Sequence, residues 1–189
     1  MLCRNDESEL NVVKVSVRLT LILALIVGLV ACESELDEYS DAFNPVFQTH
    51  LDLYTVEFGE VLSEAEEAGN VHSRSAKPNM AGGIAILNEM NKRLENIRYE
   101  LAAVNREWTL LYPPKEAQKF HELVLETMQV RLHAVQETLN AYTLLAAGQM
   151  ELTMEGLEKA YALNDEGDRL FTKVLAEGRT LGNIEIIRE

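Results

Sequence analysis

The chain has 189 residues, of which 31 are acidic and 17 basic, so its formal net charge at pH 7 is −14. A surface this acidic repels phosphate backbones and anionic headgroups, which argues against nucleic-acid binding. The length suits one domain with a sizeable core.

An uncharged apolar run, LTLILALIVGLV, occupies residues 19–30 and follows Lys14 and Arg18. A basic flank, an apolar core and a small residue such as Ala31 form the pattern of a secretory signal. A transmembrane helix needs about 20 apolar residues, and the two basic side chains prevent the run from extending that far. We therefore expect residues 1–31 to be a cleaved signal peptide.

The run ends in Leu29-Val30-Ala31-Cys32, which resembles the lipobox of bacterial lipoproteins. The resemblance implies that the sulfur of Cys32 is alkylated by a diacylglyceryl group and that a signal peptidase cuts between Ala31 and Cys32. Two or more acyl chains make a stable membrane anchor. An ordinary signal peptide, or an apolar anchor that ends in cysteine by chance, is the alternative.

A lipidated Cys32 predicts an address on the extracytoplasmic side of a cell membrane or outer membrane. In the lipoproteins that the chain resembles, an aspartate directly after the cysteine favours retention in the inner membrane. Glu33 stands at this position, so the resemblance favours the outer membrane. Cleavage removes Cys3 and leaves 158 residues, and because the leader carries three acidic and three basic residues the charge stays at −14. No thiol is then left for a disulfide, a thiolate metal site or a nucleophile.

The acidic segment 32–44 fits either a short tether or the start of a helix, because Leu36, Tyr39 and Phe43 extend the apolar stripe of the first helix backwards. Asn44 and Pro45 favour a helix start here, since proline at the first helical position loses no hydrogen bond. Apolar residues at spacings of three and four then predict a first helix that ends near Gly69, followed by a polar linker over residues 69–79.

Three further apolar stripes predict three more helices. The second runs from about residue 80 to 111, and Pro113 and Pro114 then favour the start of a third that ends near Gly148. The fourth covers about 153–178, and residues 179–189 form a tail. Long helices with short connections predict an all-α, up-and-down bundle of about four helices over residues 45–178.

His121 is the histidine of most interest, because it lies beside the predicted core stripe of the third helix. Its functional interpretations are a metal ligand and a haem ligand. As a haem ligand it would face a methionine across the core, with the candidates Met80, Met90, Met128, Met150 and Met154. The Glu-x-x-His pair of di-iron bundles is absent at all four histidines. A hydrogen bond from the imidazole to a backbone carbonyl is the simpler interpretation.

Polar residues interrupt the fourth stripe at Asn164 and Asp168. An EF-hand alignment on Gly167 places Ala162 and Lys173 where carboxylates are required, so a calcium loop does not fit. We expect a polar notch formed by Asn164, Asp168 and, as a third candidate, His121. Either neighbouring side chains form hydrogen bonds with these polar groups, or the groups line a small pocket.

The sequence contains no nucleophile elbow, phosphate loop, dinucleotide fingerprint or zinc-protease motif. We therefore expect no enzyme, cofactor or metal, but a lipid-anchored bundle that binds an envelope protein or a small ligand. A haem or metal carrier and an envelope enzyme are the alternatives. Pro113, Pro114 and His121 after a lipobox loosely resemble uncharacterised small helical-bundle lipoproteins, which implies no activity.

Overall fold

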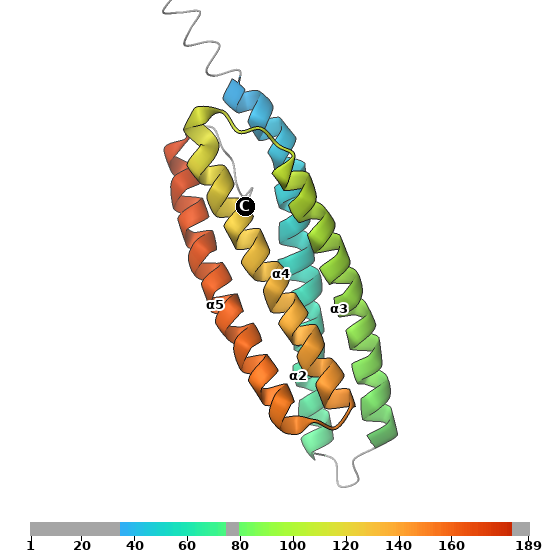
Figure 1. Cartoon of the computed structure of the whole chain (residues 1–189). Coiled ribbons are helices and arrows are strands. Elements are labelled where there is room, and N and C mark those ends of the chain that lie inside the picture. The colour runs from blue at the N-terminus through green and yellow to red at the C-terminus, as the bar shows by residue number, and fades with distance from the viewer. Residues whose placement is uncertain (1–34, 75–79, 183–189) are drawn as a thin grey trace, which may run out of the picture.

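The computed structural model describes residues 35–74 and 80–182, and every regular element in these residues is helical (Figure 1). A helical rod spans 35–74 and comprises an α-helix over 35–51, the π-helix η1 (Asp52–Phe58) and α2 (Gly59–Arg74). It is followed by α3 (Met80–Thr109), α4 (Gln118–Ala146) and α5 (Met150–Thr180). The predicted all-α bundle of four long helices is confirmed.

The first helix is longer at both ends than its sequence pattern predicted. Residues 35–44 are helical rather than a tether, and Tyr39 and Phe43 are buried in the core. Of the two interpretations of residues 32–44, the start of a helix is therefore right for the residues that the structure describes. The start at Asn44 and Pro45 is wrong, because burying two aromatic rings favours an earlier start. The helix also continues through Gly69 to Arg74. The predicted signal peptide, with Ala31 and Cys32, lies outside the described residues.

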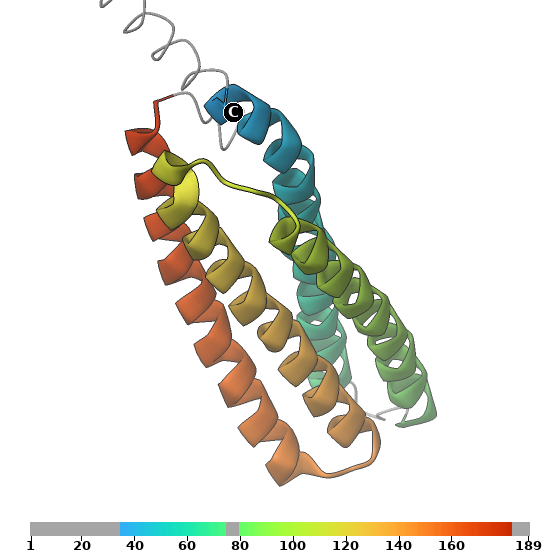
Figure 2. The same ribbon diagram turned by 45° about the horizontal axis from the view of Figure 1, so that its top comes forward.

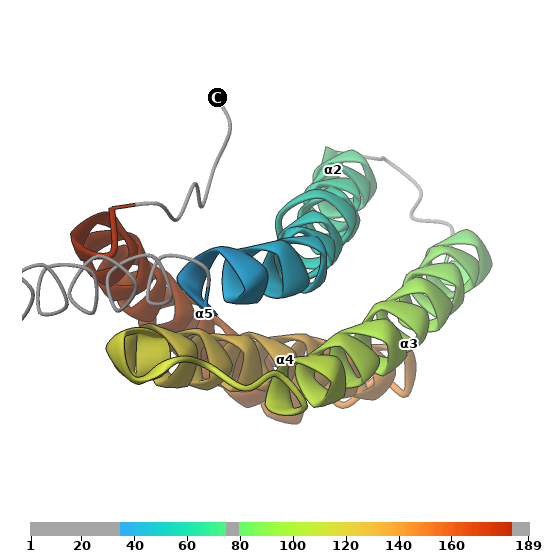
Figure 3. The ribbon, with the colours of Figure 1, turned by 90° about the horizontal axis from the view of Figure 1, so that it is seen from above.

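Pro45 thus lies inside a helix, where it cannot donate a backbone hydrogen bond to the preceding turn. The hydroxyl of Thr49 donates to the Pro45 carbonyl at 2.8 Å, and η1 begins three residues after Thr49. Proline and π-helical turns are common causes of helix bending. Figure 3 shows residues 35–51 running at an angle to α2.

Short connections join α3 to α4 and α4 to α5. Pro114 precedes the 3₁₀ turn η2 (Lys115–Ala117), and the Ala117 N–H donates to the Pro114 carbonyl at 2.9 Å. Between α4 and α5, Gly148 has φ 76°, a left-handed conformation that glycine adopts without strain. The N–H groups of Gly148 and Gln149 donate to the carbonyls of Leu145 and Leu144. These bonds form a Schellman C-cap that turns the chain back.

An aromatic cluster fills the core at the end of the bundle where residue 35 lies. The rings of Phe43 and Phe120 have centroids 5.3 Å apart, and Trp108 packs on both Phe43 and Phe47. The Trp108 indole donates to the His121 carbonyl at 3.1 Å, which satisfies its polar edge. Within 35–74 and 80–182, no helix has the length and apolar character to span a membrane.

Candidate functional site

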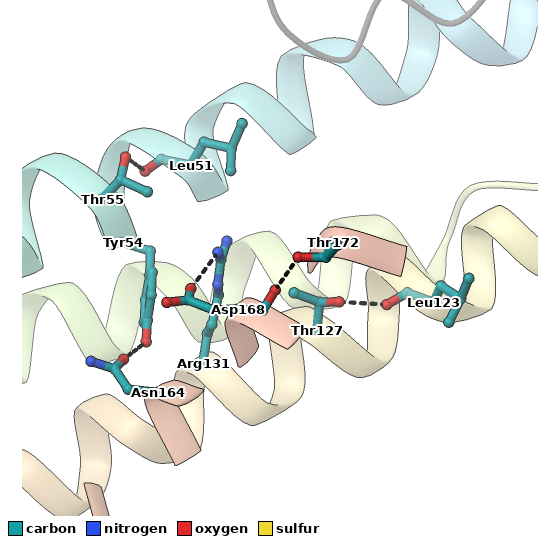
Figure 4. A network of polar contacts seen from close by, with 9 residues as sticks. All are labelled: Leu51, Tyr54, Thr55, Leu123, Thr127, Arg131, Asn164, Asp168 and Thr172. Carbon is teal, nitrogen blue, oxygen red and sulfur yellow. Dashed lines mark hydrogen bonds and ion pairs between the residues drawn. The ribbon is translucent and has the colours of Figure 1, made fainter. Parts of the chain in front are cut away.

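A polar cluster that is buried at Tyr54 and Arg131 and open to solvent at Asp168 joins three helical segments (Figure 4). Tyr54 comes from η1, Arg131 from α4, and Asn164 and Asp168 from α5. The structure therefore brings Asn164 and Asp168, which the sequence placed in a polar notch, to the side chains of two residues that sequence analysis did not select.

Arg131 is the centre of this cluster. Its guanidinium lies between two aromatic rings, 4.6 Å from the ring centroid of Tyr54 and 4.7 Å from that of Phe171. Gly167 leaves room for the stem, since a Cβ there would lie 3.1 Å from the Arg131 Cγ. Burial lowers the pKa of Arg131, although a guanidinium stays protonated at neutral pH. The bundle thus holds a positive charge in its interior.

Asp168 and Asn164 each accept a hydrogen bond in this cluster. The Arg131 Nη2 donates to the Asp168 carboxylate at 3.5 Å, a long contact. The Tyr54 hydroxyl donates to the Asn164 side-chain oxygen. Burial raises the pKa of Tyr54, so the phenol stays protonated and keeps its donor role. Both predicted notch residues are therefore paired with residues of neighbouring helices.

His50 lies one helical turn before Tyr54 and is fully buried. Its ring is parallel to that of Tyr54 with centroids 6.2 Å apart. Burial, together with the positive charge of Arg131, lowers the pKa of His50 to about 3. The imidazole is therefore neutral at pH 7, with one N–H donor and one acceptor nitrogen.

Several polar atoms around this cluster have no hydrogen-bond partner among the described residues. They are both ring nitrogens of His50 and the Nε and Nη1 atoms of Arg131. Buried groups of this kind are usually satisfied by ordered water or by a bound polar group. Because Arg131 offers only donors and carries a positive charge, the cluster suits an oxygen acceptor and disfavours a metal cation.

His121 belongs to a different part of the core. Its Nδ1 is 2.9 Å from the Tyr39 hydroxyl, and its ring stacks on Trp108 with centroids 5.2 Å apart. It lies ten positions before Arg131 in α4, about 15 Å along a helix. The prediction that His121 shares a notch with Asn164 and Asp168 was therefore wrong. Its ring partner is also a tyrosine hydroxyl, not the expected backbone carbonyl.

Burial lowers the pKa of His121, so the neutral imidazole is favoured. The bond to Tyr39 engages one of its two nitrogens. Of the methionines considered as its haem partner, Met90 and Met128 are buried, whereas Met150 and Met154 are exposed. No group of three or more histidine, cysteine or acidic side chains in the described segments is arranged to hold a metal ion.

A separate groove of about 510 Å³ lies between α4 and α5, away from the polar cluster. The two helices come close beside it, because Gly156 of α5 faces Ala141 of α4 across the interface. Charged side chains of both signs line it, and none of His121, Asn164 and Asp168 does. The lining residues are Glu137, Asn140, Thr143, Leu144, Leu152, Glu155, Gly156 and Lys159.

No protein-family model, curated protein or solved structure matches the chain. Its function is therefore argued from its own residues.

Proposed function

We propose that the chain is a lipid-anchored protein on the extracytoplasmic side of a bacterial membrane, where its bundle serves as a non-catalytic binding module. The observation that carries the proposal is Cys32 directly after Leu29, Val30 and Ala31 at the end of an uncharged run. Acyl chains confine a protein to a surface and raise its effective concentration toward partners there. The partner would be an envelope protein or a small ligand.

The contacts of the polar cluster do not favour a catalytic role. In the polar cluster, tyrosine is paired with asparagine and arginine with aspartate, so the observed pairs join no nucleophile to a base. His50 touches the ring of Tyr54 and has a strongly lowered pKa, which makes it a weak base. These features are typical of a cluster that fixes the packing of helices.

Metabolic labelling with a palmitate analogue tests the anchor. The full chain, expressed in a bacterium, should take up label, and Cys32→Ala should abolish it because the thioether needs the sulfur. Cys3→Ala is the matched control, since it removes a cysteine outside the lipobox and should leave labelling unchanged. Equal label in the wild type and in Cys32→Ala would overturn the proposal.

A second measurement separates a binding module from a haem or metal carrier. The protein purified from its native host should be colourless and free of stoichiometric metal, and a crosslinked partner should be recovered reproducibly. A Soret band that His121→Ala abolishes would instead establish a haem protein. Stoichiometric metal would establish a metal carrier.

A further inference from the structure

The connection between α3 and α4 exposes apolar side chains at one end of the bundle. Its sequence over residues 110–114 is LLYPP. Leu110 is 73% exposed and Tyr112 is 94% exposed, whereas Leu111 packs against the core. Leu111 therefore holds the loop in place while Leu110 and Tyr112 face away from the bundle.

This loop lies at the end of the bundle from which the predicted lipid anchor extends. The bond between Tyr39 and His121 aligns the beginning of the first helix with the beginning of α4, directly after the loop. Figures 1 and 2 show the loop crossing the end of the bundle that contains residue 35. The opposite end carries the turn at Gly148.

The distance from the anchor to this end is short. Cys32 precedes the first described helical residue by three positions, a length of chain that spans at most about 10 Å. A lipidated Cys32 therefore keeps the loop end of the bundle close to the bilayer. A body on a long flexible tether would have no such restriction.

We infer that Leu110 and Tyr112 insert into the lipid–water interface and dock this end of the bundle on the membrane. The inference rests on the lipid anchor proposed above. Tyrosine suits the interface because its ring is apolar and its hydroxyl stays hydrated, and leucine gains by leaving water. The acyl chains already confine the protein, so two side chains are enough to set its orientation.

The charges near the loop indicate which kind of lipid headgroup it tolerates. Glu35, Asp37 and Glu38 are exposed at the start of the first helix, and Lys115 follows the loop. The acidic side chains disfavour tight contact with anionic headgroups. Docking through Leu110 and Tyr112 should therefore occur on zwitterionic lipid and change little with salt, as expected for apolar insertion.

Fluorescence quenching by lipids with brominated acyl chains tests the inference. The full chain is expressed in a bacterium, purified from its membranes and reconstituted into phosphatidylcholine vesicles. Tyr112→Trp reports on the loop, and Tyr161→Trp is the matched control, because Tyr161 is 63% exposed but lies in the middle of α5. The wild type, whose one tryptophan is buried Trp108, supplies the background.

Mass spectrometry of the N-terminal peptide is read from the same samples. If Cys32 is lipidated, we expect bromolipid to reduce the emission of Tyr112→Trp and to leave that of Tyr161→Trp unchanged. Lipidated protein without quenching at Tyr112→Trp, or with equal quenching at both positions, overturns the inference while the anchor stands. Unmodified Cys32 overturns both proposals.

A second copy of the chain, or another protein, is the competing occupant of the loop. In that case the emission of Tyr112→Trp would shift to the blue with rising protein concentration, or on adding the partner, without any lipid. Such a shift, with no further change on bromolipid vesicles, would also overturn membrane docking.

Discussion

The guanidinium of Arg131 and the carboxylate of Asp168 are 3.5 Å apart, yet the Arg131 side chain is 3% exposed and that of Asp168 is 75% exposed. The ion pair thus joins a buried charge to a solvated one. Solvent weakens the attraction of the exposed carboxylate, while the guanidinium bears the full cost of desolvation. The guanidinium stacks between the rings of Tyr54 and Phe171, and this cation–π attraction offsets part of the desolvation cost.

Arg131→Met should therefore raise the free energy of unfolding, by about 1 kcal/mol, because it removes the desolvation cost and leaves no buried carboxylate unpaired. Arg131→Lys should lower it, since an ammonium is more strongly hydrated and cannot stack between two rings. Urea denaturation of both variants measures the difference. A large loss of stability in Arg131→Met would show instead that the guanidinium makes a strong interaction with a bound group.

Tyr54→Phe tests the hydrogen bond to Asn164. The variant keeps the ring that stacks on Arg131 but leaves the half-buried Asn164 side chain without its donor. We expect the free energy of unfolding to fall by about 1 kcal/mol. Tyr161→Phe, at an exposed position of α5, is the control and should change nothing measurable. Equal effects of the two substitutions would mean that the bond contributes nothing to stability.

His50 should make the bundle sensitive to acid. In the folded protein the pKa of His50 is about 3, against 6.5 for an ordinary histidine. Between these two values the imidazole is protonated in the unfolded chain and neutral in the folded chain, so acid favours unfolding. The contribution of His50 is complete above pH 6.5. It falls by about 1.4 kcal/mol per pH unit as the pH drops toward 3.

The comparison of wild type with His50→Gln isolates this contribution. Carboxylates and His121 titrate in both proteins, so their effects cancel in the difference. The dependence of the melting temperature on pH between 6.5 and 4 should be shallower in the variant, whatever its absolute stability. Parallel curves would contradict a buried neutral imidazole at this position.

Gly156 tests how closely α4 and α5 pack. A Cβ at Gly156 would lie 3.1 Å from the Ala141 Cβ and 3.5 Å from its Cα, so α4 and α5 would have to move apart by a few tenths of an ångström. Gly156→Ala should lower the free energy of unfolding by about 1 kcal/mol despite the better helix propensity of alanine.

Gly69→Ala is the matched control in α2. A Cβ there meets no heavy atom within 4 Å, so only propensity acts, and the free energy of unfolding should rise by about 0.5 to 1 kcal/mol. Thermal or urea unfolding of the two variants gives opposite signs if the close approach is real. Stabilisation by both substitutions would show that α4 and α5 have room to spare.

The helices were predictable from the sequence because a 3.6-residue period, two prolines before α4 and a glycine after it are local features. The start of the first helix was left open by the sequence, because the stripe of Leu36, Tyr39 and Phe43 favoured an early start and Asn44 and Pro45 a later one. Pro45 suggested a boundary, but Phe43 packs against Phe120, a residue far away in the chain, and that contact extends the helix past the proline. Tertiary packing overrode the local preference.

Only part of the polar cluster was predicted from the sequence. Asn164 and Asp168 interrupt an apolar stripe, whereas Arg131 was missed. A usable indication existed, since Arg131 falls between Met128 and Val135 at the helical spacing of the core. His50 likewise falls between Phe47 and Tyr54. The partner of His121 could not be foreseen, because Tyr39 comes from a segment that the sequence left open between a tether and the start of a helix.

The π-helix η1 also has a consequence for how this chain tolerates changes of length. Each π turn accommodates one residue more than an α turn. Deleting a residue from an ordinary helix rotates the rest of the helix by about 100°, so that buried side chains then face solvent. Within η1 (Asp52–Phe58), a one-residue deletion converts π geometry to α geometry instead. Among natural relatives we therefore expect a single-residue gap to be accommodated here more readily than anywhere in α4.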